Sequence, residues 1–272
     1  MAPVSSGMRV AVILPAAGAS SRYLATGGLR SKLDEDLGGK PVLQRTVELF
    51  TKHDDVGEII VAGPAGEAEF AEFKERHADR LGLLGARVCR GGVTHRWETV
   101  RAALEQVGSE ATHIAVHDAA RPCVSMELLD RVFSAARRHG AAIPAVEVSD
   151  TVKRVKETGE KMGGDDGVAA ILGETAESAK PLRVVEGTVE RRGLVLVQTP
   201  QVFEAGLLRR AYAQADLTST DDAGLVERLG VRVVVVDGEA RNIKITRPGD
   251  LGLARAILGL KEAEGRPVHK RF

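Results

Sequence analysis

A run of small residues behind an apolar segment is the stretch of this chain best suited to chemistry. Residues 16–21 (AAGASS) follow residues 10–14 (VAVIL), which are long enough for a buried strand. Small side chains let backbone N–H groups come close to a ligand, and phosphate is the usual ligand of such a turn. Arg22 and Lys32 follow, and arginine offers phosphate a planar fork where lysine offers a mobile point charge. The stretch predicts a polyphosphate site; the alternative is an ordinary strand-to-helix turn with solvated cations.

This loop fits neither of two common phosphate-binding motifs. The dinucleotide fingerprint G-x-G-x-x-G needs three glycines, and only Gly18 is present. The P-loop motif G-x-x-x-x-G-K-[ST] fails at Gly39-Lys40, because Pro41 follows the lysine and the first glycine is missing. The site is therefore expected to hold phosphate without either motif.

A second candidate group lies in residues 117–122 (HDAARP), directly after a predicted strand at 114–116. An acid just past a buried strand lies at the edge where open α/β sheets bind ligands. Asp118 could hold Mg²⁺, which favours one or two carboxylates plus substrate phosphates, or it could equally be the N-cap of a turn. Arg121 could meet an anion or simply pair with a surface acid.

The elements that must position these residues alternate between strand and helix along almost the whole chain. Strands are predicted at 10–14, 57–62, 86–90, 114–116, 141–146, 194–199, 231–236 and 242–246. Helices are predicted from Pro41 to 50 and at 66–80, 96–107, 126–139, 204–215, 221–229 and 248–261. The alternation predicts an α/β fold, a doubly wound and mostly parallel sheet covered on both faces.

Residues 156–193 interrupt this pattern, because they are rich in Gly, Glu, Lys and Asp and only weakly periodic. A structureless loop of that length is unusual in a compact domain. We therefore expect an arm that leaves the core and either carries structure or binds something.

Composition narrows the class of protein. The 272 residues include 38 Lys plus Arg against 38 Asp plus Glu, so no overall field favours nucleic acid or an acidic membrane. Aromatic residues make up 3%, too few for the stacking platforms of single-strand binders. Cys89 and Cys123 form no CxxC pair, which fits a reducing compartment. No apolar run is as long as a membrane span and residues 1–8 lack the apolar core of a signal peptide, so the cytoplasm is the expected location.

Eight stretches, in order along the chain, resemble the motifs of one enzyme family. They are LPAAGASSR (14–22), GGKPVLQRTVELF (38–50), GGVTHRWETV (91–100), HDAARP (117–122), SDTVKRV (149–155), RGLVLVQTPQVF (192–203), STDDAGLVERLG (219–230) and RNIKITRPGDL (241–251). In these stretches the chain is similar to the 2-C-methyl-D-erythritol 4-phosphate cytidylyltransferases of the non-mevalonate isoprenoid pathway. The resemblance implies one Rossmann-like nucleotidyltransferase domain over residues 1–272, with a protruding dimerisation arm at about 150–193.

The resemblance also implies a reaction. CTP and methylerythritol 4-phosphate would give 4-diphosphocytidyl-2-C-methyl-D-erythritol and pyrophosphate with Mg²⁺, the phosphate of the acceptor attacking the α-phosphorus of CTP. Because that nucleophile is already an anion, catalysis should rest on positioning and charge stabilisation. In the family an arm from each subunit crosses the other, which implies a homodimer in which some site residues come from the partner subunit.

Site residues carry over from the family by position. The resemblance makes Arg22, Lys32 and Lys244 the catalytic cations and Asp118 the Mg²⁺ ligand. It assigns the nucleotide to Ala16, Ala17, Gly18, Gly91, Gly92 and Thr99. It assigns the sugar-alcohol phosphate to Arg121, Thr151, Arg191 and Thr199.

The chain departs from the family pattern at four places. The loop between Arg22 and Lys32 is longer than usual, and Ser31 replaces the common Pro before the lysine, so placing Lys32 would cost more entropy if the loop is floppy. The segment after Gly91-Gly92 is one residue longer, and Thr99 stands where Ser is typical but keeps the hydroxyl. The arm carries an insertion at about 156–190, hypothesised to lengthen the arm and the dimer contact.

Three other functions are compatible with part of the sequence. A ribitol 5-phosphate cytidylyltransferase would share the loop and the CTP chemistry, but Ala120 and SDTVKRV favour the methylerythritol acceptor. A catalytically inactive nucleotide-binding scaffold should have lost the loop cations or the acid, and here all are present. A dehydrogenase is disfavoured because the glycine fingerprint is absent and no acid closes the second predicted strand.

Overall fold

A computed structural model describes residues 7–161 and 181–260 of the chain. The chain divides into two compact units, one formed by residues up to Val146 together with those from Val197 onward, the other by Glu147–Leu196. The second unit takes in the predicted arm, and residues 162–180 of the predicted insertion lie outside the described residues. Within the described residues no helix is long and apolar enough to cross a membrane.

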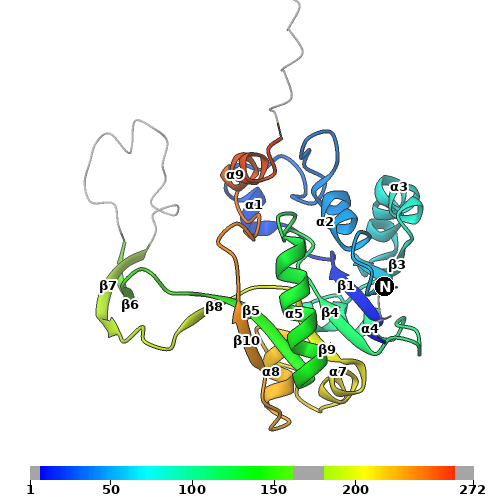
Figure 1. Cartoon of the computed structure of the whole chain (residues 1–272). Coiled ribbons are helices and arrows are strands. Elements are labelled where there is room, and N and C mark those ends of the chain that lie inside the picture. Colours follow the sequence, from blue (N-terminus) through cyan, green and yellow to red (C-terminus); the bar gives the residue numbers. More distant parts are fainter. Residues whose placement is uncertain (1–6, 162–180, 261–272) are drawn as a thin grey trace, which may run out of the picture. The chain divides into compact units, whose positions relative to one another are not determined.

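The first unit is built on one sheet, in the strand order β10-β5-β9-β4-β1-β2-β3 (Figure 1). Neighbours in this order run parallel except for β9, which is antiparallel to both β4 and β5. The strands are β1 (Val10–Pro15), β2 (Val56–Gly63), β3 (Ala86–Arg90), β4 (His113–Val116), β5 (Ala141–Glu147), β9 (Gln201–Glu204) and β10 (Val234–Asp237). The predicted α/β fold with a mostly parallel sheet is confirmed.

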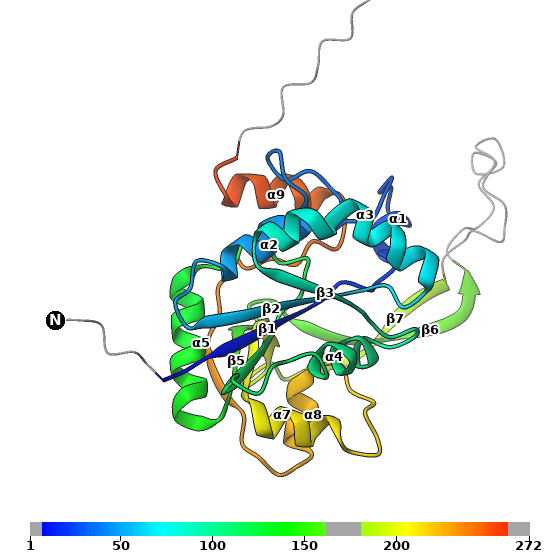
Figure 2. The ribbon, with the colours of Figure 1, turned by 90° about the vertical axis from the view of Figure 1, so that its right-hand side faces the viewer.

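Helices cover both faces of this sheet (Figure 2). One face carries α2 (Val42–Phe50), α3 (Glu67–Leu83), α5 (Met126–His139) and α9 (Gly249–Ile257). The other carries α4 (Arg96–Leu104), α7 (Ala205–Tyr212) and α8 (Asp222–Glu227). Strand β1 shows why both faces must be covered, since Val12 and Leu14 pack into the first core while Ala11 and Ile13 pack into the second.

In the C-terminal third of the chain the predicted helices form, as α7, α8 and α9, but the predicted strands are partly wrong. One strand was expected at 194–199, whereas the structure has a short β8 (Val195–Val197) and then β9, whose antiparallel insertion between β4 and β5 was missed. In place of the strand expected at 231–236, the structure has the shorter β10, which begins three residues later. It lies at the edge of the sheet, and Val235 on it is half exposed.

The strand expected at 242–246 does not form. Ile243 and Ile245 alternate with polar residues in the sequence, but the buried residues are Asn242 and Ile245, three positions apart, and their backbone N–H groups donate to the carbonyls of Glu239 and Ala120. The segment is a loop that packs against residues 118–121, and it carries Lys244 there.

The second unit contains a two-stranded antiparallel hairpin of β6 (Val152–Lys161) and β7 (Pro181–Val189). Irregularities in its register occur near Arg154 and after Glu157. Its described residues are mostly exposed, and Val155, Val185, Leu194 and Leu196 are large apolar side chains among them.

Candidate functional site

The small-residue loop lines a cavity of about 360 Å³ at the carboxyl end of β1. Its start is held to the sheet by the N–H of Ala16, which donates to the carbonyl of Ala62 at 2.7 Å. The loop then passes through Ser20, a non-glycine residue in the left-handed region (φ 54°), into the short helix α1 (Ser21–Leu24). Predicted site residues that line the cavity are Ala16, Ala17, Gly18, Lys32, Gly92, Thr99, Asp118 and Lys244.

Lys32 lies in a positively charged part of this cavity. Burial and the nearby charges of Lys244, Arg22 and Arg121 lower the pKa of Lys32, although Asp118 opposes the shift. A group of cations that disfavour one another's charge is stabilised when an anion enters. A polyphosphate would match this charge, and the polyphosphate site stays a prediction.

Asp118 is the acid at the centre of the site. Its Oδ2 lies 2.9 Å from Lys244 Nζ and 3.1 Å from Arg121 Nε, and its Oδ1 lies 3.9 Å from Arg96 Nε. Burial alone would raise the pKa of Asp118, but Lys244, Arg96 and Arg121 together hold it well below its usual range. The carboxylate contacts side-chain cations, so the alternative role as a turn cap finds no support. Arg121 likewise pairs with this acid in the site instead of with one on the surface.

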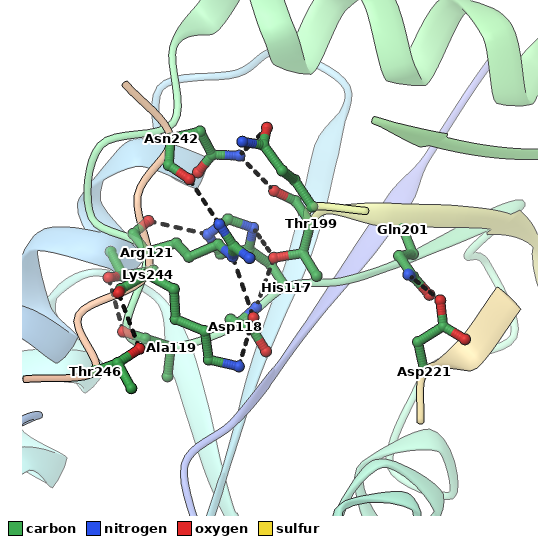
Figure 3. A network of polar contacts seen from close by, with 12 residues as sticks. His117, Asp118, Ala119, Arg121, Thr199, Gln201, Asp221, Asn242, Lys244 and Thr246 are labelled. Atoms are coloured by element: carbon green, nitrogen blue, oxygen red, sulfur yellow. Dashed lines mark hydrogen bonds and ion pairs between the residues drawn. The ribbon is translucent and has the colours of Figure 1, made fainter. Parts of the chain in front are cut away.

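A polar network behind Asp118 fixes the surrounding backbone (Figure 3). The backbone N–H of Asp118 donates to Thr199 Oγ1 at 3.0 Å, and Thr199 Oγ1 lies 3.1 Å from His117 Nδ1. Burial lowers the pKa of His117 to about 4, so the ring is neutral; its Nε2–H donates to the Arg121 carbonyl and Nδ1 accepts from Thr199. Asn242 closes the network. Its side-chain Nδ2–H donates to the backbone carbonyl of Thr199, and its backbone carbonyl accepts from the Arg121 guanidinium at 2.6 Å.

The glycine pair opposite the small-residue loop is held by the first turn of α4. A Cβ on Gly92 would lie 2.0 Å from Cβ of Glu98, and one on Gly91 would lie 2.6 Å from the carbonyl oxygen of Gly63, so both positions need glycine. Thr99 Oγ1 accepts from the N–H of Gly92 at 3.1 Å. The hydroxyl expected at Thr99 is thus used to hold Gly92.

Glu98 sets the register of the longer segment between Gly92 and α4. Its Oε2 accepts from the N–H groups of Thr94 at 2.7 Å and His95 at 3.2 Å, which forms a capping box at the start of the helix. These backbone donors lower the pKa of the Glu98 carboxyl. The segment is therefore a capped turn, and Thr94 and His95 line the cavity.

A second cavity, of about 330 Å³, lies against the first. Arg121, Thr199 and Gln201 line it, and Arg96, Asp118 and Lys244 line both cavities. Two ligands could therefore meet at these three charged residues, one from each side.

Arg96 is a site residue that sequence reasoning missed. Its guanidinium lies 2.8 Å from Oδ2 of the fully buried Asp222, whose Oδ1 accepts from the Tyr212 hydroxyl at 2.5 Å. Although burial opposes it, Asp222 raises the pKa of Arg96 above its usual value. The motif STDDAG contained the signal for this pair, since it has two adjacent acids and a helix needs only one as its N-cap. Asp221 caps α8, and the buried Asp222 pairs with Arg96.

Four predicted site residues do not line the first or second cavity. Arg22 is exposed on α1, and Gly91 lies close to the carbonyl of Gly63 and the side chain of Thr99. Thr151 and Arg191 belong to the second unit, where both are exposed and Arg191 donates a hydrogen bond to the carbonyl of Ser149. Their roles stay predictions.

Comparison with known proteins gives a consistent answer over nearly the whole chain. A family model described as 2-C-methyl-D-erythritol 4-phosphate cytidylyltransferase (IspD) matches residues 10–167 and 166–260. A relative of that name from Symbiobacterium thermophilum is 40% identical over 92% of this chain and 92% of its own length. One from Frankia casuarinae is also 40% identical, over 94% of this chain and 83% of its own length. The crystal structure of the enzyme of that name from Thermus thermophilus is similar with a TM-score of 0.64 at 33% identity, covering 92% of this chain and 98% of its own. A crystal structure of a 4-diphosphocytidyl-2C-methyl-D-erythritol synthase gives a TM-score of 0.68 at 32% identity with the same coverage.

Proposed function

The chain belongs to the 2-C-methyl-D-erythritol 4-phosphate cytidylyltransferase family of nucleotidyltransferases, and we propose how its cavities divide the work of that reaction. CTP binds in the first cavity, with its phosphates on the small-residue loop and its cytidine toward Gly92 and Thr99. The sugar-alcohol phosphate binds in the second cavity. Its phosphate oxygen forms a bond to the α-phosphorus of CTP, the bond from that phosphorus to the β-phosphate oxygen breaks, and pyrophosphate leaves.

The observation that carries this proposal is the set of charged residues common to both cavities. Arg96, Asp118 and Lys244 line both, so the two phosphates would meet beside them. The attacking oxygen is already anionic and needs no general base. What the site must supply is positioning, and positive charge where the pentacoordinate phosphorus and the leaving pyrophosphate develop negative charge. Lys32 and Lys244 supply that charge in this proposal, with Arg22 above the loop.

Asp118 also suits the Mg²⁺ that the family resemblance implies. Within the described residues no group of three or more His, Cys, Asp or Glu side chains could hold a metal ion by itself. Asp118 is the only acid among the described residues that line the first cavity. Mg²⁺ is commonly held by one or two carboxylates plus substrate phosphates, and a single ionised aspartate beside a phosphate site fits that pattern. The ion would neutralise phosphate charge and order the triphosphate.

The acceptor is tested by offering two substrates in parallel. We expect purified protein with Mg²⁺ and CTP to release pyrophosphate with methylerythritol 4-phosphate and not with ribitol 5-phosphate. Release with ribitol 5-phosphate alone would keep the chemistry and overturn the acceptor. No release with either, in a folded protein that binds CTP, would favour the inactive scaffold.

The second unit supports a homodimer in the family manner, through the hairpin of β6 and β7. Its exposed apolar side chains at Val155, Val185, Leu194 and Leu196 would be covered by a second copy of the chain. Thr151 and Arg191 would then serve the acceptor site of the partner subunit. We also propose the cytoplasm as the location, in keeping with the free thiols of Cys89 and Cys123.

Replacing Arg191 tests its assignment to the acceptor. Because a charge-assisted hydrogen bond to phosphate is strong, Arg191→Ala should raise KM for methylerythritol 4-phosphate by about 10- to 100-fold and leave KM for CTP nearly unchanged. The adjacent and equally exposed Arg192 is the matched control, and Arg192→Ala should change neither constant. Equal increases in both constants would remove Arg191 from the acceptor site.

Glu98 provides a test of the nucleotide segment. Glu98→Ala leaves the N–H groups of Thr94 and His95 without their acceptor, so the segment beside Gly92 loosens. We expect KM for CTP to rise about three- to tenfold, with KM for the acceptor unchanged. Glu105→Ala, at the opposite end of the same helix, should have no effect; a similar increase there, or none in Glu98→Ala, would contradict the role of the capped turn.

A further inference from the structure

We propose that His77, acting through Asp34, is a positioning residue for Lys32. The inference rests on the proposed function, in which Lys32 stabilises the reacting phosphates. It concerns how a lysine at the end of a long loop is kept in place.

The chain that leads to Lys32 is held mainly by local contacts, such as the N–H of Gly28 donating to the carbonyl of Tyr23 and Arg30 pairing with Glu35 at 3.1 Å. Between α1 and Lys32 most residues are exposed, and Leu29 is almost completely so. At the end of this loop Ser31 Oγ lies 3.2 Å from Ser20 Oγ, and the N–H of Lys32 lies 3.3 Å from the same Ser20 oxygen. The Ser31 that replaces the common proline thus links the loop to the small-residue turn, but through long, weak contacts.

The stronger attachment lies on the other side of Lys32. Asp34 Oδ1 is 2.6 Å from His77 Nε2, and Asp34 Oδ2 is 3.1 Å from the guanidinium of Arg76, on the same helix. Burial would raise the pKa of Asp34, but its hydrogen bond to His77 and the charges of His77, Arg76 and Arg30 lower it. The carboxylate is therefore ionised and held by helix α3, two residues after Lys32.

His77 is a rigid attachment point because α3 buries it. Its side chain is 4% exposed, on a helix face that otherwise buries Phe70, Phe73 and Leu81. The ring packs on Phe73 at 4.8 Å between centroids. Phe73 in turn packs so closely over Gly63, at the end of β2, that a Cβ there would lie 2.8 Å from its ring. A buried polar atom needs a partner, and the partner of this one is Asp34.

The consequence concerns the rate of the chemical step. Lys32 must keep its place while the charge on phosphorus changes, and a displacement of about 1 Å in a positioned group can cost about 100-fold in rate. The pairing of Asp34 with His77 joins residues 43 positions apart. It adds to the buried Leu33, whose carbonyl accepts from the N–H of Leu43, in holding the backbone directly after Lys32. It should act on kcat, since binding of CTP also uses the small-residue loop and the Gly92 segment.

The test replaces one buried histidine and compares it with another. His77→Phe keeps an aromatic ring beside Phe73 and removes the hydrogen bond to Asp34. The matched control is His53→Phe, since His53 is also buried, packs on Phe133 and lies 3.2 Å from an aspartate, Asp130, that lines no part of the first cavity. We expect His77→Phe to lower kcat by about 10- to 100-fold with KM for CTP changed less than about threefold. Amide hydrogen exchange across residues 28–36 should become faster, and His53→Phe should change neither quantity.

Two further variants keep the proposal open to refutation. His77→Gln retains an N–H donor and should restore part of kcat, and Asp34→Ala breaks the same link without altering the core beneath α3. If the two residues act through each other, kcat of the double variant should equal that of the slower single variant. Three outcomes would each overturn the proposal: amide exchange in His77→Phe that is no faster than in the wild type, faster exchange with kcat unchanged, or losses of kcat that add in the double variant. If the wild-type protein transferred nothing, the proposed function would fail, while the exchange comparison would still decide whether His77 holds the loop.

Discussion

Replacing Lys32 with alanine should lower kcat for pyrophosphate release by about 10²- to 10³-fold, the usual cost of removing one group that stabilises transition-state charge in a closed site. The side chain lines a cavity where burial, and then the charges of Lys244 and other cations, lower its pKa, so an anionic ligand would stabilise its charged form. KM for CTP should change less than kcat, because the small-residue loop and the Gly92 segment still bind the nucleotide. The measurement is steady-state kinetics on purified, folded variant.

The matched control for that experiment is Lys40→Ala. Lys40 lies eight residues further along the chain, pairs with the part-buried Glu48 at 2.7 Å and lines no part of the cavity. Its removal should leave kcat within about twofold, because neither side chain lines the cavity where the phosphates are proposed to react. Turnover near the wild-type value in Lys32→Ala, or an equal loss in both variants, would show that Lys32 has no special role.

The second large effect is expected at Asp118. Asp118→Ala should lower turnover by at least about 10²-fold, since it removes the proposed Mg²⁺ ligand and leaves Lys244, Arg96 and Arg121 without their shared counter-charge. Asp118→Asn should be similarly slow although it keeps the volume of the side chain. Circular dichroism should show an intact fold in both, and Asp130→Asn, at an exposed aspartate, should be as active as the wild type. Near-normal turnover in either Asp118 variant would refute the assignment.

Asp118 also gives the pH dependence a definite sign. Its pKa in the folded protein lies below the usual value near 3.9, so its ionised form stabilises the fold fully above that value. The contribution is lost as the pH falls toward the lower pKa of the folded state. Denaturant titrations between pH 7 and pH 3 should therefore show a smaller acid-dependent loss in Asp118→Asn than in the wild type. An identical loss would mean that Asp118 is not coupled to its cations.

Local sequence patterns pointed to the centre of the candidate site, although each pattern by itself left an ordinary structural role open. The loop after β1 and the acid after β4 each follow a short buried strand, and both features can be recognised without knowledge of the rest of the chain. The two strands are parallel neighbours, with Ile13 paired to Val116, so their carboxyl ends must lie side by side. That topology brings the small-residue loop and Asp118 together.

What the sequence could not reveal depends on contacts between distant residues. Strand β9 has only four residues and is stabilised by its antiparallel partners β4 and β5, so its own pattern is too short to predict it. Apolar and polar residues alternate at 242–246, but the segment is a loop, in which the N–H of Ile245 donates to the carbonyl of Ala120. Arg96 with Asp222, and Asp34 with His77, are pairs whose members look like ordinary surface charges until the fold buries them.

The most direct test of the account is to follow oxygen from the acceptor phosphate into the products. Methylerythritol 4-phosphate labelled with ¹⁸O at its terminal phosphate oxygens would be incubated with CTP, Mg²⁺ and the full-length protein, and the products analysed by mass spectrometry. Attack of that phosphate on the α-phosphorus of CTP predicts that all the label is retained in the diphosphocytidyl product and that the released pyrophosphate is unlabelled. Release of CMP in place of pyrophosphate, label in the pyrophosphate, or no transfer by a folded protein that binds CTP would contradict it.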